Sequence, residues 1–388
     1  MSIDIVMERK IRVLHITPDD KFFDFVYPLW ETVPMFANRA ALFPDQHVHR
    51  SCDLKYIKNR DSVTVFDSKG DFISFLVAGD YDVVFFHSLL PKYYDLLASV
   101  PQEKVVIWWA WGVDLYQYSG AYAPLIKLDR YKPLTQQFIR SSVLGMKMLG
   151  KKWLSSLLQY RHRRELRMVL QRIDYFQPVV REEFLYMRQI EPFHAKEFYY
   201  KREGLPYESS VCRKEGDILL CHSAVPDDNH LDVYEAVKKY RNDGQRMIMP
   251  LGYGKSEYRK WLLSKIHDSN VHPLIDFLPS QEYFKILNGC SYAVFGSIRQ
   301  MALGNVSYVL SKGIKVFLYK ESMNYKNLKG LGYAVYAIEE MNEESFSTPL
   351  TKEELEQNKR AASLELERKN SVFNSFINDM KSRFFYIQ

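Results

Sequence analysis

The chain has 388 residues, of which 47% are hydrophobic and 26% are charged, and its formal net charge is +6. This composition excludes an intrinsically disordered chain, and the length exceeds that of one typical core, so two domains are expected. No window offers about 18 uninterrupted apolar residues, so we predict no transmembrane helix. The four cysteines are scattered without a CxxC pair, which argues against a zinc site and for reduced thiols in a cytosolic compartment.

Strand and helix alternate in the first half of the chain. Apolar runs at 11–16, 81–88 and 104–110 lack polar alternation, which predicts strands that are covered on both faces. A further strand is expected at about 174–180, followed by a helix over 181–190. The polar stretch 199–217 carries Gly and Pro, so we place the domain boundary there and expect a first, acceptor-binding domain over 1–205.

A basic segment lies between the strands at 104–110 and 174–180. From Arg140 to Arg172 there are nine Lys and Arg residues against one acid. Apolar residues recur there at three- and four-residue spacing: Met146, Leu149, Trp153, Leu157 and Tyr160. This spacing predicts a helix over about 139–172 that contacts an anionic inner-membrane surface with its apolar face and its lysines. A domain-packing helix with a solvated basic face is the alternative that the pattern leaves open.

The second half is a more regular α/β series. Strands are expected within 217–223, 245–254, 271–279, 290–300, 314–322 and 333–338, with helices between most of them. Repeated β-α units with right-handed crossovers predict doubly wound parallel sheets, and two such domains facing one cleft form the GT-B architecture. We expect a nucleotide-sugar-binding second domain over 206–350, and a closing helix over 351–388 that packs back toward the first domain.

Ligands of such sheets bind beyond the carboxyl ends of the strands, so the loops at those ends carry the candidate residues. In the second half the candidates for binding a nucleotide-sugar are His222, Ser223, Asn229, Gly252, Tyr253, Arg299, Gln300, Gly304, Asn305 and Glu321. A helix start and a cation can neutralise a leaving diphosphate without a metal, and Arg299 is the expected cation. Tyr253 is expected to stack on the base, Glu321 to accept from sugar or ribose hydroxyls, and Gly304 to allow close helix packing. Helix capping, a plain turn and solvated side chains are the alternatives for these positions.

The stretch IWWAWGVDLY, from Ile107 to Tyr116, ends a strand of the first half with three tryptophans and a carboxylate. Asp114 is the expected base that activates an acceptor hydroxyl, and His87 is the competing base or the partner that orients Asp114. Trp111 and Tyr116 are expected to contact the acceptor, with Trp111 stacking on a sugar. Capping of the next helix by Asp114 is the structural alternative.

Five short motifs occur in one order along the chain: WxWGxDLY, HSxxxxxNH, PLGYG, FLPSQEYFKIL and RQxxxGN. Together they resemble the TDP-N-acetylfucosamine:lipid II N-acetylfucosaminyltransferase family, glycosyltransferase family 56, over about residues 80–325. The resemblance implies a GT-B enzyme on the cytoplasmic side of the inner membrane that acts in bacterial cell-envelope polysaccharide assembly. It implies transfer of a deoxy-amino sugar from a TDP-linked donor to a polyprenyl-diphosphate-linked saccharide, with no metal or other cofactor. The chain departs from the family at His222 and Ala224, where the family has Asn and Gly.

Two functions of other classes share these features. A nucleotide-sugar isomerase resembling 2-epimerases can use the same two-domain plan, although it has no use for a basic membrane-seeking helix. A non-catalytic peripheral scaffold of a polysaccharide complex would keep the fold without binding a nucleotide. Nucleic acid is not an expected partner, because the basic segment lacks RNP-like or helix-turn-helix spacing.

Overall fold

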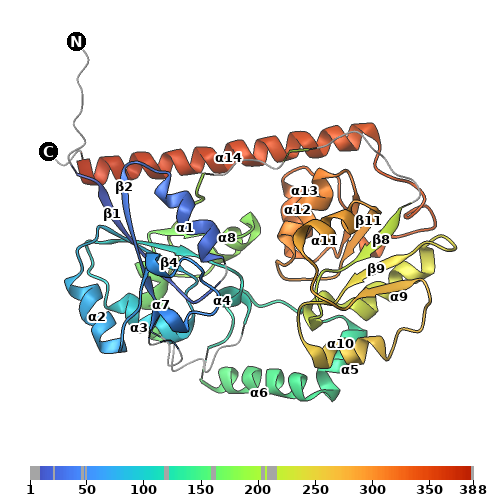
Figure 1. Ribbon diagram of the computed structural model, residues 1–388, viewed down its shortest axis with the longest axis horizontal. Coiled ribbons are helices and arrows are strands. Elements are labelled where there is room, and N and C mark those ends of the chain that lie inside the picture. The colour runs from blue at the N-terminus through green and yellow to red at the C-terminus, as the bar shows by residue number, and fades with distance from the viewer. Residues whose placement is uncertain are drawn as a thin grey trace, which may run out of the picture.

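The computed structural model describes residues 9–385, apart from 21, 45–47, 49, 118–121, 159–162, 202–205 and 208–215. Two parallel sheets, one in each half of the chain, are flanked by helices, and the long helix α14 runs along both halves (Figure 1). The two doubly wound domains confirm the fold predicted from the sequence. The predicted boundary at 205/206 falls beside residues outside the described part of the chain.

The first sheet has seven parallel strands in the order β3-β2-β1-β4-β5-β6-β7. Their bounds are β1 Ile11–Thr17, β2 Phe36–Leu42, β3 Val63–Thr64, β4 Val83–His87, β5 Val105–Trp109, β6 Tyr175–Gln177 and β7 Lys196–Glu197. His87 pairs with Trp109 in the register of β4 and β5, so the carboxyl ends of these two strands lie at the same edge. Strand β2 is not recognisable from the sequence alone, because polar residues interrupt its apolar pattern.

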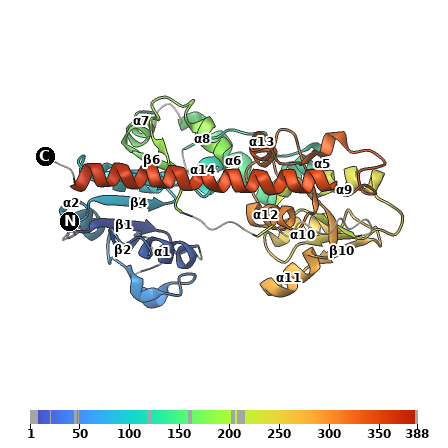
Figure 2. The same cartoon turned by 90° about the horizontal axis from the view of Figure 1, so that it is seen from above.

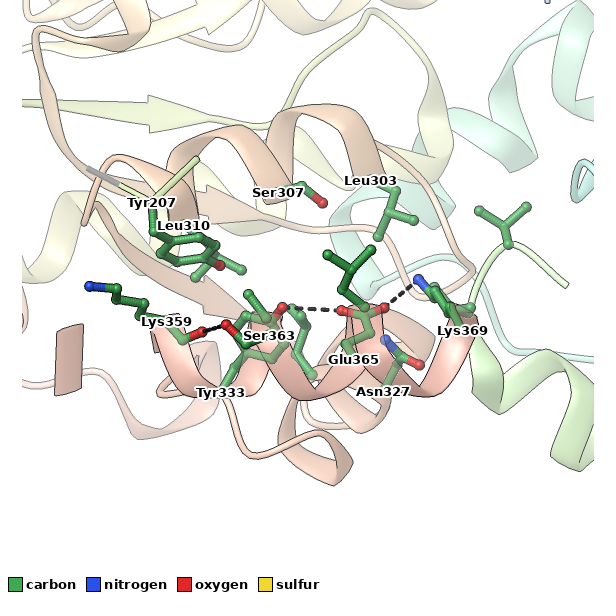
Figure 3. A pocket seen from close by; sticks show the side chains of 15 residues that line it. Tyr207, Leu303, Ser307, Leu310, Asn327, Tyr333, Lys359, Ser363, Glu365 and Lys369 are labelled. Atoms are coloured by element: carbon green, nitrogen blue, oxygen red, sulfur yellow. Dashed lines mark hydrogen bonds and ion pairs between the residues drawn. The ribbon is translucent and has the colours of Figure 1, made fainter. Parts of the chain in front are cut away.

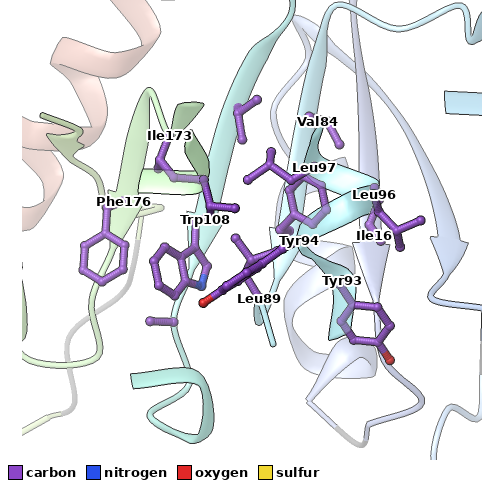
Figure 4. Close-up of a cluster of buried hydrophobic side chains, with 14 of the residues drawn as sticks. Ile16, Val84, Leu89, Tyr93, Tyr94, Leu96, Leu97, Trp108, Ile173 and Phe176 are labelled. Carbon is purple, nitrogen blue, oxygen red and sulfur yellow. The ribbon is translucent and has the colours of Figure 1, made fainter. Parts of the chain in front are cut away.

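Helices cover both faces of the first sheet. They are α1 Phe23–Glu31, α2 Lys69–Ala78, α3 Tyr94–Ala98, α4 Val113–Tyr116, α7 Arg163–Arg172 and α8 Arg181–Met187. One core contains Leu97, Trp108 and Phe176, with Trp108 packed edge-on against Phe176 at 5.0 Å between ring centroids (Figure 4). A second core contains Trp30 and Phe85. Burial on both faces explains why these strands are apolar without alternation.

The second sheet has six parallel strands in the order β10-β9-β8-β11-β12-β13. The strands are β8 Asp217–Leu220, β9 Met247–Pro250, β10 Val271–Leu274, β11 Cys290–Phe295, β12 Lys315–Leu318 and β13 Tyr336–Ala337. The helices are α9 His230–Tyr240, α10 Ser256–Leu263, α11 Ser280–Leu287, α12 Leu303–Ser311 and α13 Met323–Gly330. The order reverses between β8 and β11, and open α/β sheets bind ligands in the crevice at such a point.

Helix α14, Lys352–Phe385, connects the two domains (Figure 2). Its first half packs on the second domain, where Ala361 belongs to the core around α12. Its second half inserts Phe373, Phe376 and Met380 into the core of the first domain. Arg368 adds an ion pair of 3.1 Å with Glu197 at the end of β7. The closing helix therefore contributes to both hydrophobic cores.

The single helix expected over about 139–172 is wrong, because the segment forms α5 Pro133–Ser141, α6 Val143–Leu158 and α7. Ser142 is extended, with φ −100° and ψ 153°, and it breaks the helix between α5 and α6. Tyr160, expected on the apolar face, lies outside the described residues. Helix α5 packs on the second domain, whose core includes Phe138 and Ile139. In the described parts of the chain, no helix combines the length and the apolar character that crossing a bilayer requires.

Candidate active site

The carboxyl edges of the two sheets meet at the domain interface. A Cβ atom built on Gly112, in the loop after β5, would lie 3.3 Å from Oε1 of Gln300, in the loop after β11. Beside this contact, the backbone N–H of Arg181 donates to Oδ1 of Asn327 at 3.0 Å. The strand-end loops that the sequence analysis selected in both halves therefore come together, as expected for two facing sheets.

Asp114 is buried, and both of its carboxylate oxygens are occupied by protein donors. Oδ2 accepts from the backbone N–H of Leu89 at 3.1 Å and from Nε1 of Trp108 at 2.8 Å, and Oδ1 accepts from the N–H of Trp111 at 3.1 Å. Burial raises the pKa of Asp114 despite these bonds. The arrangement ties the end of β4 to the end of β5. In this arrangement the carboxylate contacts protein donors, and the role of Asp114 as the base stays a prediction.

His87 is buried as well, and it bonds to another histidine rather than to Asp114. Its Nε2 lies 3.0 Å from Nδ1 of His15, whose Nε2 lies 3.1 Å from Oδ1 of Asn38. Burial and the neighbouring His15 lower the pKa of His87 well below the usual value, which keeps it neutral. The structure therefore does not bring the two expected first-domain bases together, and neither faces solvent.

The aromatic residues after β5 also pack within the protein. Trp111 is half-buried and stacks on Trp109, at 4.5 Å between centroids, and on Phe22, at 4.8 Å. Tyr116 is buried and donates to Oε1 of Glu183 at 2.9 Å, so its hydroxyl is engaged within the first domain, and its expected contact with an acceptor stays a prediction. Glu183, which the sequence analysis missed, lies at the start of α8, and its burial raises its pKa to about 7.

In the second domain, two glycines allow the loop after β9 to pack closely against the loops after β8 and β10. Gly254 has φ +130°, and a Cβ atom there would lie 2.4 Å from the carbonyl oxygen of Ala224. Gly252 approaches Asp276 equally closely, with 2.3 Å between a Cβ atom and its carbonyl oxygen. Between them Tyr253 is 65% exposed.

A buried carboxylate organises the loop after β8. Oδ1 of Asp228 lies 3.0 Å from Nδ1 of His222, and Oδ2 accepts from the backbone N–H and the hydroxyl of Ser223 at 3.2 and 3.1 Å. Burial alone would raise the pKa of Asp228, but the neighbouring His222 and His230 and the hydroxyl of Ser223 together lower it. Asp228 therefore holds His222 and Ser223 in fixed positions at the edge of the second sheet.

Asp227 binds two arginines from different parts of the chain. Its Oδ1 accepts from Nε of Arg299 at 2.7 Å and from Nη1 of Arg130 at 3.1 Å. Arg130 belongs to the chain segment that crosses from the first domain to the second. The next residue, Tyr131, places its hydroxyl 3.4 Å from Oδ2 of Asp227. The cluster combines two cations with one carboxylate, so it carries a net positive charge.

Helix α12 begins four residues beyond Arg299, at Leu303. Ala302, at its N-cap, has φ +57° and provides no side-chain cap. Gly304 is exposed and a Cβ atom on it would meet nothing within 4 Å, so the expectation that this glycine permits tight packing is wrong. Asn305 donates to the hydroxyl of Tyr283 at 3.1 Å. An uncapped helix start next to an arginine is a site that attracts anions.

Two further candidates contact the crossing segment. Nδ2 of the buried Asn229 donates to the carbonyl oxygens of Arg130 and Gly296 at 3.0 and 2.8 Å, so its amide fastens the segment and is not free for a nucleotide. The half-exposed Glu321 pairs with Lys132. Within the described ranges, no cluster of three His, Cys, Asp or Glu side chains could hold a metal ion.

The sequence analysis missed Arg130, Lys132 and Asp227. Asp227 lies inside the motif HSxxxxxNH, where helix capping was the alternative left open for the neighbouring candidates. The two cations lie in a stretch without a motif, and only the fold brings them to the second domain. The sequence feature that could have indicated them is a basic residue on each side of Tyr131, and such a pattern is too common to predict a site.

No family model matches the chain, and no curated protein matches it. Among solved structures, the chain is similar to Anabaena HepE in complex with UDP and glucose, with a TM-score of 0.56, 11% identity, and coverage of 96% of this chain and 100% of that one. It is also similar to the α,α-trehalose 6-phosphate synthase of Burkholderia multivorans, with a TM-score of 0.56, 8% identity, and coverage of 96% and 97%. AviGT4, a glycosyltransferase involved in avilamycin A biosynthesis, gives a TM-score of 0.51 at 11% identity, with coverage of 96% and 97%. The two doubly wound domains and the connecting C-terminal helix are the GT-B architecture.

Proposed function

We propose that the chain is a glycosyltransferase that binds a nucleotide-sugar donor at the carboxyl edge of its second sheet. The observation that carries the proposal is the position of Arg299 in the loop between β11 and the uncapped start of α12, at the switch point of that sheet. Departure of a nucleoside diphosphate leaves negative charge on the phosphate oxygens. A guanidinium and a helix start, both fixed before the reaction, stabilise that charge as it develops.

The rest of this edge has the groups that a nucleotide needs. The exposed ring of Tyr253 can stack on a base, and the half-exposed carboxylate of Glu321 can accept from ribose or sugar hydroxyls. His222 and Ser223, held by Asp228, offer polar groups at the end of β8. The buried Asp114 and Glu183 of the first domain keep the opposing loop in place.

The five motifs that resemble glycosyltransferase family 56 support a TDP-linked deoxy-amino sugar as the donor and a polyprenyl-diphosphate-linked saccharide as the acceptor. An acceptor of this kind is anchored in a membrane, so the enzyme must work at a membrane surface. The proposed location is the cytoplasmic side of the inner membrane.

Helix α6 has the features of a membrane-binding helix. Met146, Leu149, Trp153 and Leu157 share one face and all are exposed, Trp153 by 67%. On the opposite side of the helix Leu144 and Met148 pack against the core of the second domain, and Ser155 is buried. The apolar face therefore points away from the protein. The exposed lysines at 147, 151 and 152 can contact anionic headgroups.

A thermal-shift screen of the full chain with TDP-, UDP-, GDP- and CMP-sugars tests the donor site. We expect one nucleotide class to raise the melting temperature, because a ligand that binds only the native state stabilises it. No shift with any class would contradict the proposal and favour the scaffold alternative. Conversion of the donor into an epimer without an acceptor would instead favour the isomerase.

Sedimentation with vesicles tests the membrane contact. We expect stronger binding to anionic than to neutral vesicles, and loss of binding when Trp153 and Leu157 are both replaced by Ser. Leu364→Ser is the matched control, because Leu364 is equally exposed but lies on α14. Equal binding to both vesicle types, or none to either, would contradict an electrostatic anchor.

A further inference from the structure

The segment that crosses between the domains, residues 128–135, is hydrogen-bonded to the second domain. Asn229 fastens its backbone through the carbonyl oxygen of Arg130 and the N–H of Lys132, at 3.0 and 2.9 Å. Asp232 accepts from the N–H groups of Leu134 and Thr135, both at 2.9 Å, at the start of α5. These bonds fix the position of Arg130 relative to the strand ends of the second sheet.

The guanidinium of Arg130 has N–H donors that make no hydrogen bond to the described residues. In the part of the chain that the structure describes, Nη1 is the only one of its nitrogens with a hydrogen bond, to Asp227. Nη2 of Arg299 makes no hydrogen bond to any residue that the structure describes, while Nε donates to Asp227 and Nη1 donates to the carbonyl oxygen of Gln300. The side chains of Arg130 and Arg299 are 13% and 16% exposed, so both still reach solvent.

A single carboxylate cannot neutralise two guanidinium groups. Both arginines share Oδ1 of Asp227, so one positive charge is left over in a partly desolvated place. Guanidinium groups with free N–H donors bind phosphate oxygens in a forked geometry, and a diphosphate offers several such oxygens. A low local dielectric strengthens this attraction.

We propose that Arg130 and Arg299 form a two-arginine site for the diphosphate of the donor, with Asp227 holding both guanidinium groups in place. The inference rests on the proposed function and names a diphosphate-binding residue supplied by the crossing segment. The donor site of the second domain then includes a segment that lies in sequence between β5 and β6 of the first domain. Arg130 is an anion-binding residue in this arrangement and takes no part in proton transfer.

Titration calorimetry with UDP and TDP, at low and moderate salt, tests the assignment on the full chain. We expect Arg130→Gln to weaken binding of the diphosphate that the wild type prefers by about 10-fold to 100-fold. We also expect a smaller dependence of affinity on salt, because one cation is lost. Arg241→Gln is the matched control, since the ion pair of Arg241 with Asp268 has exposures of 15% and 12% but lies away from the strand-end loops.

Arg130→Lys keeps the charge and the ion pair, so it preserves the fold if the Gln variant does not. We expect it to bind the diphosphate about 5-fold to 10-fold more weakly than the wild type, because the forked donors are gone. Wild-type affinity in either folded variant would overturn the inference while leaving the proposed function intact. If the wild type binds neither diphosphate, the proposed function itself fails.

Discussion

The two sheets share one topology, but their carboxyl edges are built differently. At the edge of the first sheet, Asp114 and Glu183 are buried and every carboxylate oxygen accepts a hydrogen bond from the protein. At the edge of the second, Arg299, Glu321 and Tyr253 all retain exposed surface. Polar residues after a strand are therefore not equivalent. Those whose bonds are complete hold the framework, and those with unused donors or exposed surface remain able to bind a ligand.

Among the variants that test this difference between the two edges, Gly254→Ala is expected to lower the free energy of unfolding the most. The loops at the second edge depend on its positive φ and on its contact with Ala224, so we expect a loss of about 4 kcal/mol in the free energy of unfolding. Gly304→Ala is the control within the same edge, and we expect a change below about 1 kcal/mol because the space around it is open. Urea denaturation measures the free energy of unfolding of both variants. Equal losses in Gly254→Ala and Gly304→Ala would contradict the expected difference between the two positions.

Asp114→Asn tests whether the buried carboxylate at the carboxyl edge of the first sheet stabilises the fold. The amide keeps only one acceptor oxygen for three N–H donors, so a donor is left facing an NH₂ group. We expect a loss of about 3 kcal/mol in the free energy of unfolding. Asp61→Asn, at an exposed position, should change it by less than about 0.5 kcal/mol. A normal melting curve combined with turnover reduced about 10²-fold to 10⁴-fold would instead restore Asp114 as the base.

Glu183→Gln adds a pH dependence to the comparison. Burial raises the pKa of Glu183 from 4.5 to about 7, so the native state prefers the neutral acid. Its contribution to stability is complete below about pH 4.5 and is lost as the pH rises through 7. We therefore expect the stability of the wild type, relative to Glu183→Gln, to fall by about 2–3 kcal/mol between pH 5 and pH 8. Denaturation at several pH values measures this difference. Glu367→Gln, at an exposed position, should show none, and a difference that rose with pH would contradict the assignment.

The sequence predicted the fold well because the strands are unusually apolar. Ile11–Thr17, Val83–His87 and Val105–Trp109 were recognisable since burial on both faces leaves no polar alternation. The break at Ser142 was missed, because the apolar spacing continues through it from α5 into α6. Helix spacing indicates which residues share a face, but it does not reveal where the chain changes direction.

The candidate site was predicted less completely than the fold. Arg299 and Asp114 were both selected by residue type and by their position after a strand. In the structure Asp114 is buried and fully bonded, whereas Arg299 still reaches solvent. Burial and hydrogen-bond partners depend on contacts between distant segments, such as the bond of Asp227 to Arg130, 97 positions away. A single sequence does not contain these contacts. For this reason the sequence did not single out Arg130, and it did not reveal the buried bond of Tyr116 to Glu183.

The most direct test of the account compares both edges in one binding experiment. The affinity of the preferred nucleoside diphosphate is measured by calorimetry for the wild type, for Arg299→Ala and for Asp114→Asn under conditions in which each is folded. We predict that Arg299→Ala weakens binding by about 1.5–3 kcal/mol, the range for a hydrogen bond to a charged group, and that Asp114→Asn stays within about threefold of the wild type. Unchanged affinity in Arg299→Ala, together with lost affinity in Asp114→Asn, would place the nucleotide at the edge of the first sheet and contradict the account.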